Sequence, residues 1–186
     1  MNITREEALA YVKPHLKTSR YEHTVRVADQ AVELAERYGV NHHHAEVAAA
    51  LHDYAKYKPL EEMRRWIVQD RRLPKDLLDY HHELWHGPVG ALMLEKEIGL
   101  SDAAVRSAID CHTTGKKHMS QLDKVIFLAD YIEPGRDFPG VDEVRKIAKS
   151  DLDQACALAL KNTIIFLVQK GRTVYPNTFH AYNDFI

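Results

Sequence analysis

Residues 46–56, EVAAALHDYAK, place an adjacent histidine and aspartate at the end of an alanine-rich apolar segment. Alanine has the highest helix propensity, so residues 46–55 are expected to be helical. A helix that is apolar on most of its surface is buried, and His52 and Asp53 are therefore expected to enter the core. An unpaired carboxylate in a protein interior is costly. The pair predicts that other polar groups, or a cation, lie beside it.

Further imidazoles and a carboxylate occupy apolar helical stripes elsewhere in the chain. Side chains four residues apart share a helix face, and by this rule each of these residues is directed inward. They are His23, His86, His112 and Asp130. One inward histidine alone is usually a core residue bonded to a backbone carbonyl. The whole set is better explained by a shared metal ion, and its nitrogen and oxygen ligands suit iron, manganese, cobalt or zinc.

Helical periodicity extends along almost the whole chain. Helix starts are expected at polar capping residues, namely Thr4, Ser19, Asn41, Ser101 and Asp151. Helix ends are expected at Gly39, Gly99, Pro134 and Gly171. Residues 125–132, VIFLADYI, have a strand-like composition, but their length and neighbours favour a helix. The sequence therefore predicts a single all-α domain of about nine helices.

Composition excludes several classes of function. The 186 residues suffice for one domain, and a net charge of -2 provides no broad basic field for nucleic acid. Two cysteines give no disulfide framework, which suits a reducing compartment. The N-terminal residues lack an apolar signal core, and no apolar run approaches the roughly 18 residues of a membrane span. We expect a cytoplasmic protein that binds neither nucleic acid nor membrane. A homodimer is expected only because symmetric dimers are the commonest oligomers of soluble proteins.

The motifs around these residues resemble those of the HD-domain metal-dependent phosphohydrolases. They read RYEH at residues 20–23, LHDYAK at 51–56, LWHGPVGA at 84–91, CHTTG at 111–115 and LADYIEPGR at 128–136. The bare His-Asp pair is a weak signal, but the full set is specific. With the tail VYPNTFHAYN at 174–183, it is most similar to the bacterial symmetrical bis(5'-nucleosyl)-tetraphosphatases of the YqeK type.

The resemblance implies a compact, bundle-like HD-domain fold across residues 1–186. Its core would cover about residues 16–135, and residues 151–186 would complete a nucleotide site. It also implies cleavage of diadenosine tetraphosphate into two ADP molecules, with iron as the usual metal. Manganese, cobalt or zinc remain open.

The resemblance assigns metal ligands residue by residue. The primary metal would be bound by His23, His52, Asp53 and Asp130. His86 and His112 could bind a second metal, with Asp53 as a bridge. In a one-metal enzyme the same two histidines would contact phosphate instead, and the sequence leaves both options open. Asp53, His86 and His112 are thus candidate catalytic groups as well.

Substrate contacts are expected from basic and hydroxyl side chains near these ligands. Lys56, also a candidate catalytic residue, and Arg136 could hold phosphate, although a surface lysine is an equal reading of Lys56. Arg20 could do the same, but a surface ion pair is favoured for it. Thr113 follows His112, where a plain helix-ending turn is equally expected.

The substrate region implied by the family also includes the metal-binding and catalytic side chains His23, His86, His112 and Asp130. By analogy alone, Tyr175, Asn177 and Thr178 of the tail would contact the base or ribose.

Other functions remain compatible with the same residues. A related phosphohydrolase could act on a mononucleotide, on (p)ppGpp or on deoxynucleoside triphosphates, because fold does not determine substrate. A non-catalytic nucleotide- or metal-sensing module would bind without turnover. A diiron oxygenase would leave Lys56 and Arg136 without an obvious role.

Overall fold

The computed structural model describes residues 3–186, which form ten α-helices and three short 3₁₀ helices without any strand. The all-α prediction is confirmed. The predicted domain begins at residue 1, and residues 1–2 lie outside the described part. The α-helices are α1 Arg5–Val12, α2 Thr18–Tyr38, α3 His42–Leu51, α4 Leu60–Gln69, α5 His86–Ile98, α6 Ala103–Cys111, α7 Gln121–Ile132, α8 Val141–Ile147, α9 Leu152–Gln169 and α10 Pro176–Asp184. The 3₁₀ helices are η1 Lys13–His15, η2 Lys75–Asp79 and η3 His82–Leu84.

Most of the predicted helix ends are confirmed. Thr4 forms the expected capping box with Glu7, and Asn41 and Asp151 accept bonds from the first turns of α3 and α9. Gly39 and Gly99 end α2 and α5 in the left-handed conformation. Two expected caps are wrong. The N-cap of α2 is Lys17 rather than Ser19, and that of α6 is Asp102 rather than Ser101. In α6 the aspartate carboxylate accepts two backbone N–H bonds, which leaves the serine outside the helix.

Two helices were not expected from the sequence. The helix α8 has only seven residues and follows a turn-rich loop, so it offers no long apolar period. The helix α10 lies in the tail, where aromatic and polar residues alternate without a clear stripe. Its Pro176 at the first helical position is the local signal for a helix start. A helix over residues 46–55 was also expected to be continuous, but α3 ends at Leu51 and the chain continues in turns.

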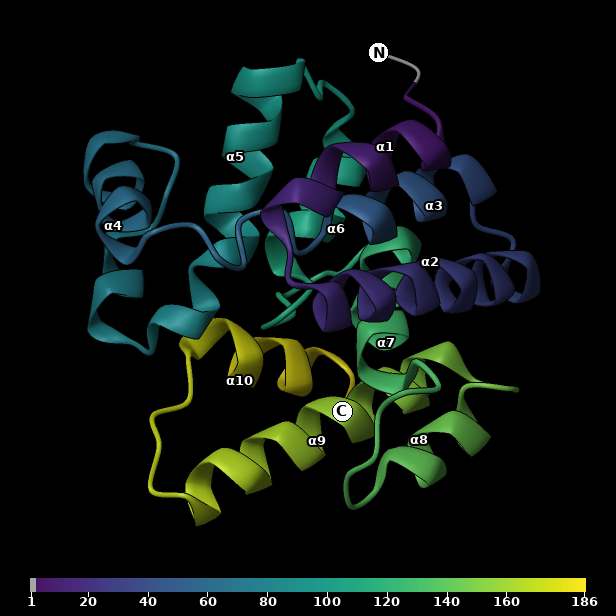
Figure 1. The fold of residues 1–186 in the computed structure, drawn as a ribbon. Coiled ribbons are helices and arrows are strands. Elements are labelled where there is room, and N and C mark those ends of the chain that lie inside the picture. Colours follow the sequence, from purple (N-terminus) through teal and green to yellow (C-terminus); the bar gives the residue numbers. More distant parts are fainter. Residues whose placement is uncertain (1–2) are drawn as a thin grey trace.

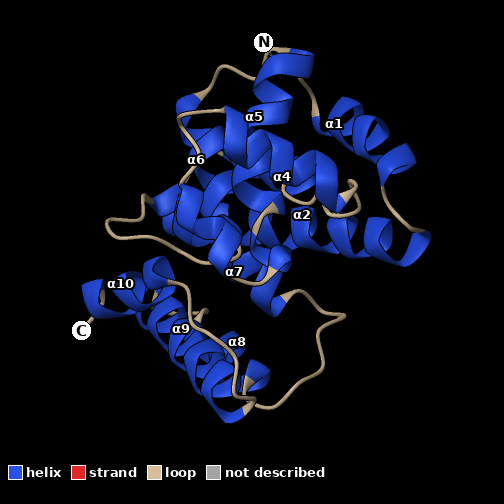
Figure 2. Cartoon of the chain, turned by 90° about the vertical axis from the view of Figure 1, so that its left-hand side faces the viewer, coloured by secondary structure: helices blue, strands red, loops and turns tan. Residues whose placement is uncertain are grey.

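The helices form an upper bundle and a lower layer. In Figure 1 the upper bundle contains α1, α2, α3, α5, α6 and α7, whereas α8, α9 and α10 lie beneath it and α4 lies to one side. Figure 2 shows the same separation from the side. Within the bundle α2 packs on α3 and α7, and α6 packs on α5 and α7. The helix α9 contacts α7, and α8 and α10 both pack on α9. His52 and Asp53 directly follow α3, which packs against α2, α6 and α7.

One glycine fixes the approach of α5 to α6. A Cβ atom on Gly87 would lie 2.6 Å from the backbone oxygen of Asp110 and 3.2 Å from that of Ile109. Backbone atoms cannot move aside as a flexible side chain can, so a larger residue would push the two helices apart. Gly87 thus allows His86, its neighbour on α5, to reach the end of α6.

Candidate metal centre

Six predicted ligands converge from five helices. His23 lies within α2, His52 and His112 cap the C-termini of α3 and α6, and His86 begins α5. The remaining two are Asp53, which follows His52 in the turn after α3, and Asp130 on α7. Side chains at helix ends can point along the helix axis toward a common point. The four histidines and Asp53 are buried, and the Asp130 side chain is 16% exposed.

The first group of atoms surrounds the boundary between α2, α3 and α7. His23 Nε2 lies 3.0 Å from Asp130 Oδ1 and 3.8 Å from Asp53 Oδ2. His52 Nε2 lies 3.1 Å from Asp53 Oδ2 and 3.9 Å from Asp130 Oδ1. His23, His52 and Asp130 each offer one atom within 4.8 Å of the others. The spacing is suitable for one shared cation.

The second group lies on the other side of Asp53. His86 Nε2 is 3.2 Å from Asp53 Oδ1 and 3.0 Å from His112 Nε2. The two oxygens of Asp53 therefore face different groups, Oδ2 toward His23 and His52 and Oδ1 toward His86. This is the arrangement that a bridging carboxylate requires.

Each histidine is oriented by a bond from its other ring nitrogen. The Nδ1 atoms of His52, His86 and His112 lie 2.6–2.7 Å from the carbonyl oxygen three residues earlier. The Nδ1 atom of His23 lies 3.0 Å from a carboxylate oxygen of Glu133. Carbonyl and ionised carboxylate oxygens only accept hydrogen bonds, so all four Nδ1 atoms must donate. In a neutral imidazole this leaves the Nε2 lone pair free to bind a metal.

The buried polar atoms of the centre fit a cation. Among the described residues, His23 Nε2, His52 Nε2 and Asp53 Oδ1 are buried without a hydrogen-bond partner. His23 Nε2 lies 3.0 Å from Asp130 Oδ1, which is itself a candidate ligand. Buried acceptors without donors are rare and costly. A divalent ion with nitrogen and oxygen ligands would satisfy all of them together.

The carboxylates of the centre are held in their ionised form. Burial alone would raise the pKa of Asp53, but His52, His86 and Arg20 outweigh it and keep that pKa well below its usual range. Burial opposes ionisation of Asp130 too, and His23 and Arg136 likewise keep its pKa well below normal. Burial, together with His86 and His52, keeps the pKa of His112 well below its usual value, so this histidine is neutral.

Arg20 is part of this centre. Its Nε–H donates to Asp53 Oδ2, and its side chain is only 18% exposed. The surface ion pair favoured from the sequence is therefore wrong. The helical spacing placed Arg20 one turn before His23, and α2 packs closely enough on α3 to bury it against the aspartate.

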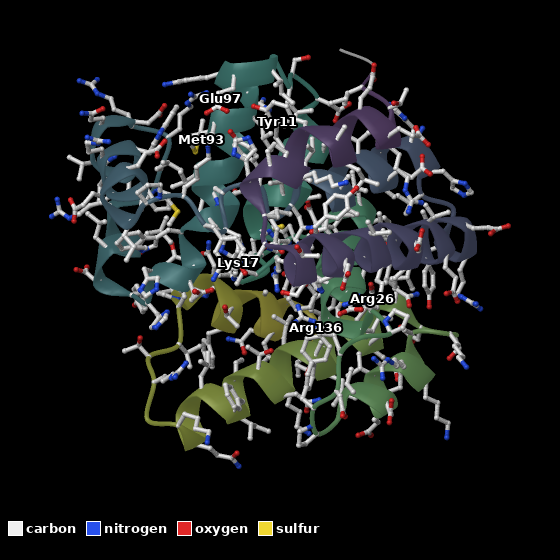
Figure 3. All side chains as sticks on the ribbon, in the orientation of Figure 1. Tyr11, Lys17, Arg26, Met93, Glu97 and Arg136 are labelled. Atoms are coloured by element: carbon white, nitrogen blue, oxygen red, sulfur yellow. The ribbon has the colours of Figure 1, made fainter. Side chains whose placement is uncertain are left out.

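Sequence reasoning missed Glu133. This buried residue follows α7 directly, accepts from Arg26 Nε at 2.6 Å and from the Gly135 N–H at 2.6 Å, and contacts His23. Burial raises its pKa, but Arg26, His23 and the Gly135 amide lower it to about 2. In Figure 3 Arg26 and Arg136 lie near each other where the upper bundle meets the lower layer. The sequence feature that could have identified Glu133 is its position three residues after Asp130, because side chains at this spacing share a helix face.

Two predicted phosphate contacts, Arg136 and Thr113, touch ligands of the centre. Arg136 donates from Nε to the Asp130 carbonyl at 2.8 Å and from Nη2 to Asp130 Oδ1 at 2.5 Å. Thr113 Oγ1 lies 3.0 Å from His112 Nε2. The ammonium of Lys56 is 2.6 Å from the carboxylate of Glu83, and the two side chains are 18% and 52% exposed.

Cavities adjoin the centre on the side of the lower layer. One of ≈200 Å³, the central cavity, is lined in part by His112, Thr113, Asp130 and Arg136. A second of ≈610 Å³, the tail pocket, is lined by His81, Glu83, Leu84, Thr113, Thr163, Phe166, Leu167, Arg172, Thr173, Tyr175 and Thr178. Two predicted tail residues, Tyr175 and Thr178, thus lie with Thr113 in one cavity.

The remaining tail residue lies next to them. Asn177 lines a further cavity of ≈320 Å³, which Tyr175 also borders. Tyr175 donates to Asp76 at 3.3 Å and packs edge-on against Tyr80. Its ring therefore forms a fixed wall between the two cavities.

Comparisons with known proteins place the chain among related sequences. The HD domain model matches residues 20–135. The chain is 52% identical to the bis(5'-nucleosyl)-tetraphosphatase, symmetrical, of Bacillus subtilis, with 97% of each sequence covered. It is 47% identical to the protein of the same name from Halalkalibacterium halodurans, over 99% of this chain and 98% of the relative.

A solved structure extends the likeness to three dimensions. The crystal structure of a predicted HD superfamily hydrolase involved in NAD metabolism, from Clostridium acetobutylicum, is 37% identical to this chain. It superposes with a TM-score of 0.91 over 100% of this chain and 98% of that one. Within residues 3–186, none of the helices combines the length and apolarity needed to cross a membrane.

Proposed function

The chain belongs to the HD-domain family, and on that premise we propose that it hydrolyses diadenosine tetraphosphate symmetrically and releases two molecules of ADP. The relatives named for this activity align along nearly the whole chain. The observation that carries the proposal is the convergence of buried acceptor atoms without donors beside basic side chains and a cavity.

The proposed metal ligands are His23, His52, Asp53 and Asp130, supported by the distances among their Nε2 and carboxylate atoms. Bound divalent metal lowers the pKa of its water toward neutrality and withdraws charge from phosphoryl oxygens. Iron is our first choice, and manganese, cobalt or zinc would suit the same ligands. His86 and His112 bind either a second ion, with Asp53 as the bridge, or a phosphate oxygen.

The chain's own residues orient the substrate. Arg136 uses two of its N–H groups on Asp130, and its remaining donors can reach phosphate oxygens in the central cavity. Lys56 would exchange its bond with Glu83 for a phosphate. Thr113 offers a hydroxyl donor in the same cavity.

One nucleoside occupies the tail pocket in this proposal. Tyr175 and Thr178 line it, and Asn177 lies behind Tyr175. Residues 151–186 would thus complete a site whose metal ligands all lie between residues 16 and 135. Burial of both cysteines as free thiols suits a reducing cytoplasm, where nucleotides are present. A symmetric dimer is proposed on general grounds only.

Product analysis tests the proposed reaction. Diadenosine tetraphosphate is incubated with protein purified anaerobically and loaded with iron or manganese, and the products are separated by anion-exchange chromatography. Symmetric cleavage yields ADP alone. Formation of ATP with AMP would contradict the symmetric reaction, and turnover only of guanosine pentaphosphate or deoxynucleoside triphosphates would assign the chain to another phosphohydrolase activity. Binding without any turnover would indicate a sensing module.

A further inference from the structure

A fourth cavity near the centre has no role in the proposed reaction. It has a volume of ≈500 Å³, within the range of about 300–1,000 Å³ of small-molecule sites. We call it the aromatic pocket. Its main lining residues are Tyr131, Phe138, Pro139, Asn162, Phe166 and Gln169. It lies between the end of α7, the loop after it and one face of α9.

The aromatic pocket adjoins both cavities that the proposed reaction uses. Tyr131, Phe138 and Thr163 line it together with the central cavity. Thr163 and Phe166 line it together with the tail pocket. These α9 side chains therefore separate the aromatic pocket from the tail pocket. The central cavity, which Asp130 lines, adjoins both. A dinucleotide bound through its central phosphates needs one nucleoside site on each side of them.

The chemistry of the lining suits a neutral heterocyclic base. Tyr131 and Phe138 meet edge to face with ring centroids 5.0 Å apart, and Phe166 is 51% exposed. Bases stack on such rings whatever their identity. Asn162 and Gln169 add amide groups, which can pair with the N6 and N7 atoms of adenine.

The charge distribution separates base from phosphate. No residue that lines the aromatic pocket is charged, whereas the adjoining central cavity contains Arg136 beside the metal ligands. Phosphates are therefore favoured in the central cavity, and the aromatic pocket is left to the uncharged end of a ligand.

We propose that the aromatic pocket binds the second nucleoside of the dinucleotide, opposite the nucleoside in the tail pocket. This inference rests on the proposed function, which supplies a substrate with two nucleosides. It assigns Phe138 to base stacking and Asn162 to recognition of the base edge. One adenosine on each side of the centre places the middle phosphates at the proposed ligands.

Binding measurements test this pocket apart from turnover. Metal-loaded protein is titrated calorimetrically with diadenosine tetraphosphate carrying a methylene group at its central bridge, and separately with ADP. The Phe138→Leu variant keeps an apolar side chain but loses the aromatic face. We expect its Kd for the dinucleotide analogue to rise about tenfold. Its Kd for ADP, which occupies the tail pocket, should stay within about twofold of wild type.

Matched variants control for folding. Phe179→Leu makes the same exchange at a 52% exposed phenylalanine of α10, outside the residues that line these cavities, and should leave both Kd values unchanged. If Phe138→Leu lowers the melting temperature markedly, Asn162→Ala serves instead. We expect Asn162→Ala to weaken the adenine dinucleotide more than its uracil counterpart.

Several outcomes would overturn the inference. The first is an unchanged Kd for the dinucleotide analogue in both Phe138→Leu and Asn162→Ala. The second is a rise in Kd that is equally large for the analogue and for ADP. The third is a wild-type protein that binds the dinucleotide analogue no more tightly than ADP. A change of oligomeric state in Phe138→Leu, seen by sedimentation with unchanged ligand binding, would assign this face to a second copy of the chain. If only the proposed function were wrong, the wild-type protein would not hydrolyse the dinucleotide. It would still bind the analogue, and Phe138→Leu would still weaken that binding.

Discussion

Two aspartates are almost fully buried in this core, and their surroundings differ. Asp123, on α7, accepts from the Ser107 hydroxyl at 2.5 Å and from the Ser120 N–H at 2.9 Å, and the Lys116 ammonium is 3.3 Å away. Asp53 pairs with Arg20 through Oδ2, but its Oδ1 has no hydrogen-bond partner. Both side chains are 1% exposed or less. Burial alone therefore does not distinguish a structural carboxylate from a functional one.

The difference lies in what faces each carboxylate. Asp123 faces donors of the protein itself, and its bonds close a capping box at the start of α7. Asp53 faces Arg20 and the Nε2 atoms of His52 and His86, whose Nδ1 atoms already donate to backbone carbonyls. Without a metal, each of these Nε2 atoms must carry a second ring proton to bond the carboxylate, and a bound cation would take the place of those protons. The contrast predicts opposite results when each residue is altered.

The largest effect is expected from Asp53→Asn. The amide cannot carry the charge that two groups of ligands share, so metal binding and hydrolysis should both fail. Loss of an outer partner of a metal ligand typically costs about 10–100-fold, and loss of the ligand itself should cost more than about a hundredfold in kcat/KM. Steady-state rates at saturating manganese measure this. Activity within about threefold of wild type would remove Asp53 from the catalytic centre.

A smaller loss is expected from Glu133→Gln. Glutamine keeps an acceptor for His23 but removes the negative charge that Arg26 and the Gly135 amide surround. We expect metal affinity to fall about 10–100-fold, with activity recovering at high metal concentration. Titration of activity against manganese concentration measures the shift. An unchanged midpoint would show that Glu133 does not orient the ligand.

A change at the other aspartate should affect stability alone. Asp123→Asn removes the charge that faces Lys116, and its amide nitrogen must replace either the oxygen that accepts from the Ser107 hydroxyl or the one that accepts from the Ser120 N–H. We expect a loss on the order of 1–2 kcal/mol in the free energy of unfolding. Urea unfolding measures it, and kcat/KM should stay within about twofold of wild type. A hundredfold loss of activity in a folded Asp123→Asn protein would abolish the distinction between the two aspartates.

The smallest effect is a pH dependence of stability due to Glu133. Its pKa is lowered from an ordinary 4.5 to about 2 in the folded protein. The folded chain therefore holds this carboxylate ionised more readily than the unfolded chain does, which stabilises folding above about pH 4.5. That contribution is lost as the pH falls from about 4.5 to about 2. Urea unfolding at pH 6 and pH 3 in chelator should show a smaller pH effect in Glu133→Gln. If the free energy of unfolding changed by the same amount between pH 6 and pH 3 in both proteins, the assigned pKa would be contradicted.

Much of the candidate site could be predicted because its residues violate a simple rule. Imidazoles and carboxylates on apolar stripes are costly in any helical fold, and this identified His23, His112 and Asp130 before the helices were placed. Asp123 is as buried as Asp53, yet the sequence did not mark it. Its position three residues after Ser120 is typical of an exposed capping box.

The rest depended on packing that local patterns do not encode. Arg20 and Glu133 acquire their roles only when α2 lies against α3 and α7. The short helix α8 and the tail helix α10 have no long apolar period, because each packs on α9 through few residues. The aromatic pocket likewise joins Phe138, in a loop, to Phe166 on α9. The family resemblance supplied the tail residues, which periodicity alone could not.

Anomalous scattering from crystals grown with manganese tests the central claim most directly. We predict a peak within coordination distance of His23 Nε2, His52 Nε2, Asp53 Oδ2 and Asp130 Oδ1, with a second peak beside His86 and His112 if two ions bind. The peak should vanish in Asp53→Asn and persist in Asp123→Asn. A well-ordered wild-type crystal with no peak among these atoms, or with manganese bound elsewhere only, would contradict the account.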